Sequence, residues 1–255
     1  MPIVDTHCHL YSEAFETDLD AVVQRAISEG VEKFYLPGID SSAIPAMLEL
    51  EHRLPGKCFA MMGLHPCYVK ENYQQELHVV KDWLSKRKFA AVGEIGLDYY
   101  WDKTFAAEQV IAFRNQLEWA IEYGLPIVIH TRNAMQETIE IVKEYVPKGV
   151  RGIFHCFSGS YESARAIIDA GFYLGIGGVL TYKNSGLVEV LSKIDLKHLV
   201  LETDAPYLTP VPFRGKRNES SYLKYVVEKL AEIKNCPVET VAEQTSVNAE
   251  KIFGL

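Results

Sequence analysis

The segment Ile3-Val4-Asp5-Thr6-His7-Cys8-His9 near the start of the chain separates two classes of α/β protein. Its first residues are β-branched and apolar, which predicts a buried strand of a parallel sheet. In a doubly wound sheet that binds dinucleotides, the turn after the first strand carries the pattern G-x-G-x-x-G. Here that turn contains two histidines separated by one residue, which argues against such a sheet.

Strand-like and helix-like segments alternate along the rest of the chain. The expected strands cover residues 3–9, 33–38, 58–64, 90–97, 126–130, 152–157, 172–177 and 199–203. Helical periodicity covers residues 18–29, 43–53, 74–86, 105–123, 133–145, 161–170 and 187–194, and two further helices are expected at 221–234 and 237–252. Strands that are apolar on both faces need helices on both sides, and eight βα units close into a barrel. The sequence therefore predicts the α/β class: a single (β/α)8 TIM barrel with extra C-terminal helices.

Composition is that of an ordinary globular protein. Of the 255 residues, 48% are hydrophobic and 24% are charged, and no linker or low-complexity tract divides them. We therefore expect residues 1–255 to form one barrel domain. The formal net charge of -8 lacks the global basic character of proteins that hold nucleic acid by phosphate neutralisation alone, so any contact with nucleic acid must be local.

Cysteine usage and hydropathy bear on the compartment. The five cysteines are odd in number and never form C-x-x-C, which argues against a disulfide framework and a cysteine-rich zinc module. The first residues lack the basic region and apolar core of a signal peptide, and no apolar run approaches the roughly 20 residues of a membrane span. We expect a cytoplasmic protein with no membrane contact and no obligate protein partner.

Six side chains suited to metal binding occupy the carboxyl ends of predicted strands: His7, His9, Glu94, His130, His155 and Asp204. Charged or imidazole groups that follow apolar strand residues are costly to desolvate unless a cation offsets the cost. Barrels place their active sites at this end of their strands. The pattern predicts a metal site there, in preference to six separate polar caps satisfied by loops.

The size of this set indicates two divalent cations. Six ligands are too many for one tetrahedral ion, and Glu94 can bridge two ions about 3.5–4 Å apart, with a shared water as nucleophile. The imidazoles favour zinc, manganese or iron over magnesium, but the choice among Mg, Mn and Zn stays open. Glu94 and Asp204 are the expected catalytic residues; Asp204 is interpreted as the general base, with a purely ligating role of equal weight.

Seven segments, in order along some 210 residues, resemble the TatD-related deoxyribonucleases, metal-dependent hydrolases of the amidohydrolase-like barrel group. They are Asp5-Thr6-His7-Cys8-His9-Leu10, Gly63-Leu64-His65-Pro66, Gly93-Glu94-Ile95-Gly96-Leu97-Asp98-Tyr99, Pro126-Ile127-Val128-Ile129-His130-Thr131-Arg132, His155-Cys156-Phe157-Ser158-Gly159, Leu201-Glu202-Thr203-Asp204-Ala205-Pro206 and Arg214-Gly215-Lys216-Arg217-Asn218. The resemblance implies that one cation is held by His7, His9, Glu94 and Asp204 and the other by Glu94, His130 and His155.

Two positions depart from the family pattern. The family often has a proline where this chain has Ser220, and its carboxyl-terminal asparagine motif reads Thr245-Ser246-Val247-Asn248 here. Neither position is a metal ligand, so the departures bear on loop shape and substrate fit. Many related barrels carry a modified lysine on the fourth strand; with Glu94 there instead, the site should assemble on addition of metal alone.

The activity implied by the resemblance is hydrolysis of DNA phosphodiester bonds by water activated between the two metals. Arg132 and Arg214 are expected to bind phosphates flanking the cut, whereas Lys216 and Arg217 are interpreted as solvated loop residues. Phe157, with Tyr99 and Tyr100, is expected to stack on an unpaired base, and core packing is an equal alternative. An exonuclease that prefers single-stranded or frayed ends is predicted, because a barrel mouth does not admit an undistorted duplex.

Two other functions remain compatible with the same residues. A barrel hydrolase acting on a small amide, ester or phosphoester would use identical metals, and an assay of single-stranded DNA beside such substrates separates the two. A non-catalytic barrel that binds nucleic acid or protein and keeps its metals for stability is the alternative from another class. Loss of cleavage in Asp204→Ala, with melting temperature and metal content unchanged, would exclude it.

Overall fold

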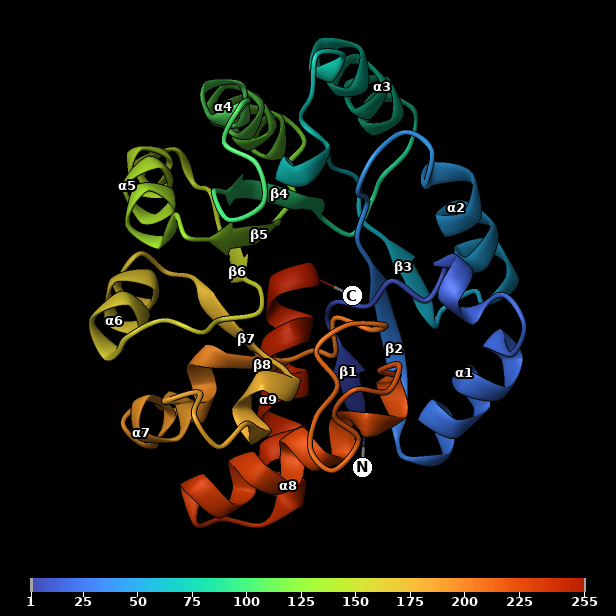
Figure 1. The fold of residues 1–255 in the computed structure, drawn as a ribbon, viewed down its shortest axis with the longest axis vertical. Helices are drawn as coiled ribbons and strands as arrows, with labels where there is room; N and C mark the ends of the chain where they lie inside the picture. The colour runs from blue at the N-terminus through green and yellow to red at the C-terminus, as the bar shows by residue number, and fades with distance from the viewer. Residues whose placement is uncertain (1, 255) are drawn as a thin grey trace.

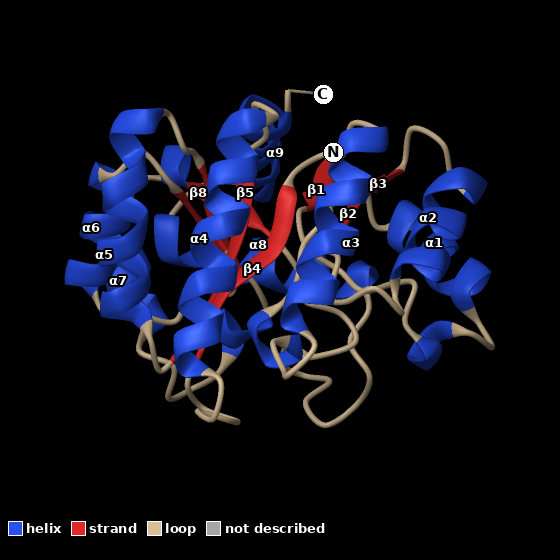
Figure 2. Ribbon diagram, turned by 90° about the horizontal axis from the view of Figure 1, so that it is seen from above, coloured by secondary structure: helices blue, strands red, loops and turns tan. Residues whose placement is uncertain are grey.

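The computed structural model describes residues 2–254, in which helices surround a core of parallel strands (Figures 1 and 2). The strands are β1 (Ile3–Asp5), β2 (Val31–Leu36), β3 (Cys58–Ala60), β4 (Val92–Asp98), β5 (Ile127–Arg132), β6 (Gly152–Phe154), β7 (Tyr173–Ile176) and β8 (Leu199–Leu201). The helices are α1 (Leu19–Ser28), α2 (Ile44–Arg53), α3 (Tyr73–Lys86), α4 (Ala106–Glu122), α5 (Met135–Tyr145), α6 (Tyr161–Asp169), α7 (Leu187–Ser192), α8 (Leu223–Lys234) and α9 (Val238–Phe253). The predicted order of βα units is confirmed.

The strands lie in chain order in two parallel sheets, β1-β2-β3 and β4-β5-β6-β7-β8. The two edges between the sheets are joined only locally. A bridge pairs Met62 with Val92 between β3 and β4, and the Thr6 N–H donates to the Leu201 carbonyl at 3.0 Å between β1 and β8. The strands therefore follow one another around the ring in chain order. Their backbone pairing is interrupted between β3 and β4 and between β8 and β1.

Several strands end earlier than the sequence predicts. β1 ends at Asp5, so His7 and His9 lie beyond the strand, and their side chains are placed by the loop rather than by a strand period. β6 and β8 likewise stop before His155 and Asp204. Glu94, by contrast, lies within β4, at the point where the pairing of β4 with β5 changes register.

One end of the strands is covered by α9, which lies at the centre of the ring in Figure 1 and opposite the long loops in Figure 2. The apolar face of α9 packs on the amino-terminal parts of the strands. We call this cluster the lower apolar layer; it consists of Val4, Tyr35, Met61, Ala91, Val128, Ile153, Val200, Ala249, Ile252 and Phe253.

Hydrogen bonds fix α9 in this position. The Asn248 side-chain amide donates to the carbonyls of Leu196 and Leu199 at 2.8 and 2.7 Å, and the Ser246 hydroxyl donates to the Pro2 carbonyl at 3.0 Å. The segment that departs from the family's asparagine motif therefore ties α9 to the strand ends. Within residues 2–254, none of the helices has the length and apolar character needed to cross a bilayer.

Candidate metal centre

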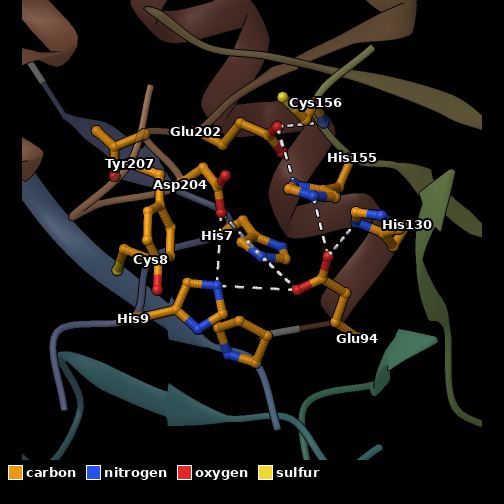
Figure 3. Close-up of polar contacts among 12 residues, drawn as sticks. His7, Cys8, His9, Glu94, His130, His155, Cys156, Glu202, Asp204 and Tyr207 are labelled. Atoms are coloured by element: carbon orange, nitrogen blue, oxygen red, sulfur yellow. Dashed lines mark hydrogen bonds and ion pairs between the residues drawn. The ribbon is translucent and has the colours of Figure 1, made fainter. Parts of the chain in front are cut away.

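Imidazoles and carboxylates converge at the loop-bearing end of the strands (Figure 3). Glu94 lies at their centre with its side chain 3% exposed. All six predicted ligands belong to this cluster, although they come from β1, β4, β5, β6 and β8 and span about 200 residues of sequence. The two carboxylate oxygens of Glu94 face different groups of histidines.

The Oε2 side of Glu94 faces His7 and His9. Their Nε2 atoms lie 3.1 and 3.8 Å from Oε2. The same two atoms lie 3.6 and 3.4 Å from Oδ1 of Asp204. These four side chains therefore enclose one small space, as the family resemblance predicts.

The Oε1 side of Glu94 faces a second group. His130 Nδ1 and His155 Nε2 lie 2.9 and 3.0 Å from Oε1. His65, from the loop after β3, places its Nε2 3.3 Å from the same oxygen. A single carboxylate thus separates two sets of nitrogen donors.

The spacing of the donor atoms is better suited to binding shared cations than to hydrogen bonding among the side chains themselves. Two ligand atoms that share one ion at bond lengths of about 2.1 Å lie roughly 3.0–3.4 Å apart, which matches the closest distances here. His7 Nε2 approaches Glu94 yet makes no hydrogen bond of acceptable geometry. Both His7 nitrogens, His155 Nδ1 and Glu202 Oε2 are buried without a hydrogen-bond partner among residues 2–254. Buried polar atoms are ordinarily paired, so this donor set fits divalent cations.

Neighbouring groups orient two of the histidines for binding. The Tyr11 hydroxyl donates to the Pro37 carbonyl and so accepts from His9 Nδ1 at 3.0 Å, which leaves the Nε2 lone pair facing Glu94. Asp98 Oδ2 lies 2.8 Å from His130 Nε2, and Nδ1 on the opposite side of the ring faces Glu94 at 2.9 Å. Carboxylates and hydroxyls behind ligating histidines commonly fix the tautomer in this way.

His65 differs from the other histidines of the cluster. Its Nδ1 accepts a hydrogen bond from the Cys67 N–H at 3.0 Å, so the neutral ring carries its proton on Nε2, which points at Glu94. Burial lowers the pKa of His65 and keeps the ring neutral. Although its position allows metal binding, this tautomer directs the Nε2–H group of His65 toward the central carboxylate, 3.3 Å away.

Electrostatics keep the two acidic ligands ionised. Burial alone raises the pKa of Glu94, but the surrounding His65, His155 and His7 outweigh it and hold that pKa well below its usual range. The pKa of Asp204 is lowered despite burial, chiefly by a hydrogen bond with His9. Both carboxylates are therefore available as anionic ligands at neutral pH.

His7 and His155 stack face to face, with ring centroids 3.8 Å apart. Burial and the neighbouring His155 lower the pKa of His7. Burial also opposes the charged form of His155, but Glu94 and Glu202 raise its pKa well above the usual value.

Buried polar residues join the strand ends that carry these ligands. Asp5 accepts hydrogen bonds from the Thr203 N–H (3.0 Å) and hydroxyl (2.6 Å), and from the Ser220 hydroxyl (2.6 Å). Burial raises the pKa of Asp5 to about 6, even though these hydrogen bonds lower it. The Asp204 N–H in turn donates to the His7 carbonyl at 2.9 Å. Ser220 thus ties the segment before α8 to the end of β1, and Thr203 ties the end of β8 to the same carboxylate.

Glu202 occupies a space that a glycine leaves open. Its side chain is fully buried, and Oε1 lies 3.2 Å from His155 Nδ1 and accepts a hydrogen bond from the Cys156 N–H. A Cβ atom added to Gly175 would lie 2.2 Å from Oε2 of Glu202. The sequence prediction missed Glu202 as part of the site, although it follows the inward-facing Val200 by two residues.

The predicted substrate-binding residues have different surroundings. Arg132 and Arg214 are exposed, and their guanidinium carbons lie 3.7 Å from the ring centroids of Tyr100 and Tyr182. Phe157 is only 2% exposed and belongs to the main hydrophobic core, so its position supports packing and not the predicted stacking on a base. Arg217, interpreted from sequence as a solvated loop residue, instead forms a bidentate ion pair with Asp18 at 2.8 and 2.7 Å.

Comparison with known proteins identifies the family. The family model described as TatD related DNase matches residues 4–254. The chain is 42% identical over 252 residues, 98% of each chain, to an "Uncharacterized metal-dependent hydrolase YabD" of Bacillus subtilis. It is 32% identical over 257 residues, again 98% of each chain, to a protein of Erwinia billingiae named "3'-5' ssDNA/RNA exonuclease TatD".

A solved structure shows the same fold. The crystal structure of YjjV, a TatD homologue from Escherichia coli K12, superposes with a TM-score of 0.93 at 30% identity, covering 99% of this chain and 98% of that one. The predicted barrel class and the predicted family are both confirmed. The chain belongs to the TatD related DNase family.

Proposed function

We propose that this protein is a metal-dependent deoxyribonuclease that hydrolyses phosphodiester bonds from an end of single-stranded or frayed DNA. The observation that carries the proposal is the position of Glu94, whose two oxygens face separate groups of imidazoles. His7, His9 and Asp204 would hold one cation with Glu94, and His130 and His155 the other. An acidic protein can bind a polyanion at this one place because the cations reverse the local charge.

Each part of the centre then has a defined task. Bound divalent cations supply Lewis acidity and positive charge for a phosphodiester anion. Asp204, the most exposed carboxylate among the ligands at 16%, is ionised and placed to accept a proton from the attacking water. His65, with its Nε2–H group 3.3 Å from Oε1 of Glu94, offers positive polarity beside the central carboxylate.

The substrate class is supported by the charge around the mouth and by the relatives. Arg132 and Arg214 are exposed at the carboxyl ends of β5 and β8 and make no ion pair with any residue between 2 and 254, so their guanidinium groups are free for phosphates. The Erwinia billingiae relative is named as a 3'-5' exonuclease of single-stranded DNA and RNA.

The test is metal content by elemental analysis coupled to nuclease activity. The protein is stripped with a chelator, reloaded with Mg, Mn or Zn, and assayed on single-stranded DNA labelled at either end. Activity should disappear on chelation and return with at least one ion. A label at the attacked end should be released as a mononucleotide, whereas a label at the opposite end should report stepwise shortened fragments. Failure of every ion to restore cleavage would contradict the proposal.

Parallel substrates separate the alternatives. Cyclic amides, simple esters and small phosphoesters are assayed beside the oligonucleotide. Hydrolysis of a small amide or ester without DNA cleavage would assign the site to a small-molecule hydrolase. Stoichiometric metal and tight DNA binding without turnover on any substrate would instead indicate a binding protein.

A further inference from the structure

The loop after β4 exposes two aromatic side chains beside the metal centre. Tyr100 is 52% exposed and Trp101 is 70% exposed, although both immediately follow Asp98 and the partly buried Tyr99. Large aromatic side chains are ordinarily buried, so exposure of two neighbours next to a binding site indicates a contact surface.

This loop is held in place on both sides of Trp101. Asp98 Oδ1 accepts the N–H groups of Tyr100 and Trp101 at 2.9 and 3.3 Å, while its Oδ2 contacts the metal-centre residue His130. On the other side, Asp102 accepts the Thr104 N–H at 2.8 Å and pairs with Lys70 at 2.9 Å. These contacts hold the backbone on both sides of Trp101, and the indole projects from this fixed segment into solvent.

Arg132 completes the surface with a positive charge. It follows His130 by two residues in β5, and its guanidinium carbon lies 3.7 Å from the Tyr100 ring centroid and 5.2 Å from that of Trp101. Since Arg132 has no carboxylate partner within residues 2–254, stacking fixes the plane of its guanidinium group but leaves its N–H groups free.

We propose that Trp101, Tyr100 and Arg132 form a subsite that binds one unpaired nucleobase and its phosphate next to the scissile bond. An indole face accepts any base by stacking, and the adjacent guanidinium pairs with the phosphate of the same nucleotide. A base within a duplex has both faces covered by its neighbours and cannot use this surface. The inference rests on the proposed nuclease function and accounts for its preference for single strands through specific residues.

Binding and cleavage are measured separately, on the metal-loaded full chain. Binding uses fluorescence anisotropy with a labelled phosphorothioate oligothymidylate that resists hydrolysis, and with an abasic oligonucleotide of equal length. Trp101→Ala should weaken binding of the base-bearing oligonucleotide roughly 10-fold or more, and the abasic one much less. Trp101→Phe should restore most of the affinity, and Arg132→Gln should weaken both and reduce the salt dependence.

Ile111→Ala is the matched control, because it removes an exposed apolar side chain, 48% exposed, from α4, outside the metal centre. It should change neither affinity. Cleavage of natural single-stranded DNA should show the Trp101→Ala effect mainly in KM. Equal weakening of both oligonucleotides, or no change in Trp101→Ala, would overturn the subsite even if the enzyme cleaves DNA. Base-dependent binding without cleavage would retain the subsite and reject the nuclease.

Discussion

The two ends of the barrel are built from the same strands but from opposite chemistry. Val128 and Ile153 belong to the lower apolar layer, and His130 and His155, each two residues further along the chain, belong to the metal centre. Within β5 the two-residue period of a strand places Val128 and His130 on the same face, whereas His155 follows the end of β6. Apolar side chains at the lower end pack against one another, whereas both nitrogens of His7, Nδ1 of His155 and Oε2 of Glu202 at the upper end have no hydrogen-bond partner among residues 2–254. The lower end thus provides stability and the upper end provides chemistry.

Asp204→Asn tests the upper end and should have the largest effect. The amide keeps the size of the side chain but cannot accept a proton, so kcat should fall by about 10²–10⁴-fold. Steady-state kinetics on single-stranded DNA measures this, with metal content and melting temperature determined on the same samples. A variant with near-normal kcat would remove Asp204 from the proposed chemistry.

Phe253→Ala tests the lower end. Phe253 is 7% exposed and stacks on Tyr35 with centroids 3.8 Å apart, so its truncation should lower the free energy of unfolding by about 3 kcal/mol. Urea denaturation gives the stability, and activity per folded molecule should remain unchanged. A large fall in kcat with little loss of stability would show that the two ends are not separate.

Gly175→Ala should weaken metal binding indirectly, through the contact of Glu202 with His155. The added methyl group would collide with the Glu202 carboxylate, displace it from His155, and lower metal affinity by about 10–100-fold. Metal titration followed by calorimetry is the measurement. Gly171→Ala is a useful contrast, because a Cβ there meets no atom within 4 Å; its positive φ of 85° predicts lower stability with normal metal affinity.

Ser220→Ala should have the smallest effect. It removes one of several hydrogen bonds to Asp5 and should cost about 1 kcal/mol of unfolding free energy. Thermal denaturation with and without added metal measures the change. If the change also abolished metal binding, Asp5 would have a larger part in positioning His7 than its remaining hydrogen bonds indicate.

Local patterns explain how much could be predicted from sequence. The order of strands and helices follows from apolar runs and helical periodicity, and His130 and His155 were found because each ends an apolar run. His65 could be recognised only as part of a segment that resembles the family, since β3 ends at Ala60 and the intervening loop obscures the direction of its side chain. The orienting role of Asp98 depends on its contact with His130, a neighbour distant in sequence.

Phe157 is a residue that the sequence predicted to border the site but whose side chain packs in the core. It follows His155 closely, yet the loop turns its ring into the core, and Cys156 between them has a left-handed backbone with φ of 49°. Sequence spacing does not reveal such a reversal. The covering of the lower end by α9 was also not predicted, because an amphipathic pattern does not specify which surface a helix packs against.

The position of α9 has a consequence for synthesis of the protein on the ribosome. Residues 238–253 are translated after every strand that they touch, and their contacts with Val4 and Tyr35 span more than 200 residues of chain. Until this segment leaves the exit tunnel, the apolar undersides of the strands stay open to water and to other nascent chains. Pausing just before codon 238 should therefore prolong the interval in which the chain is most prone to aggregate.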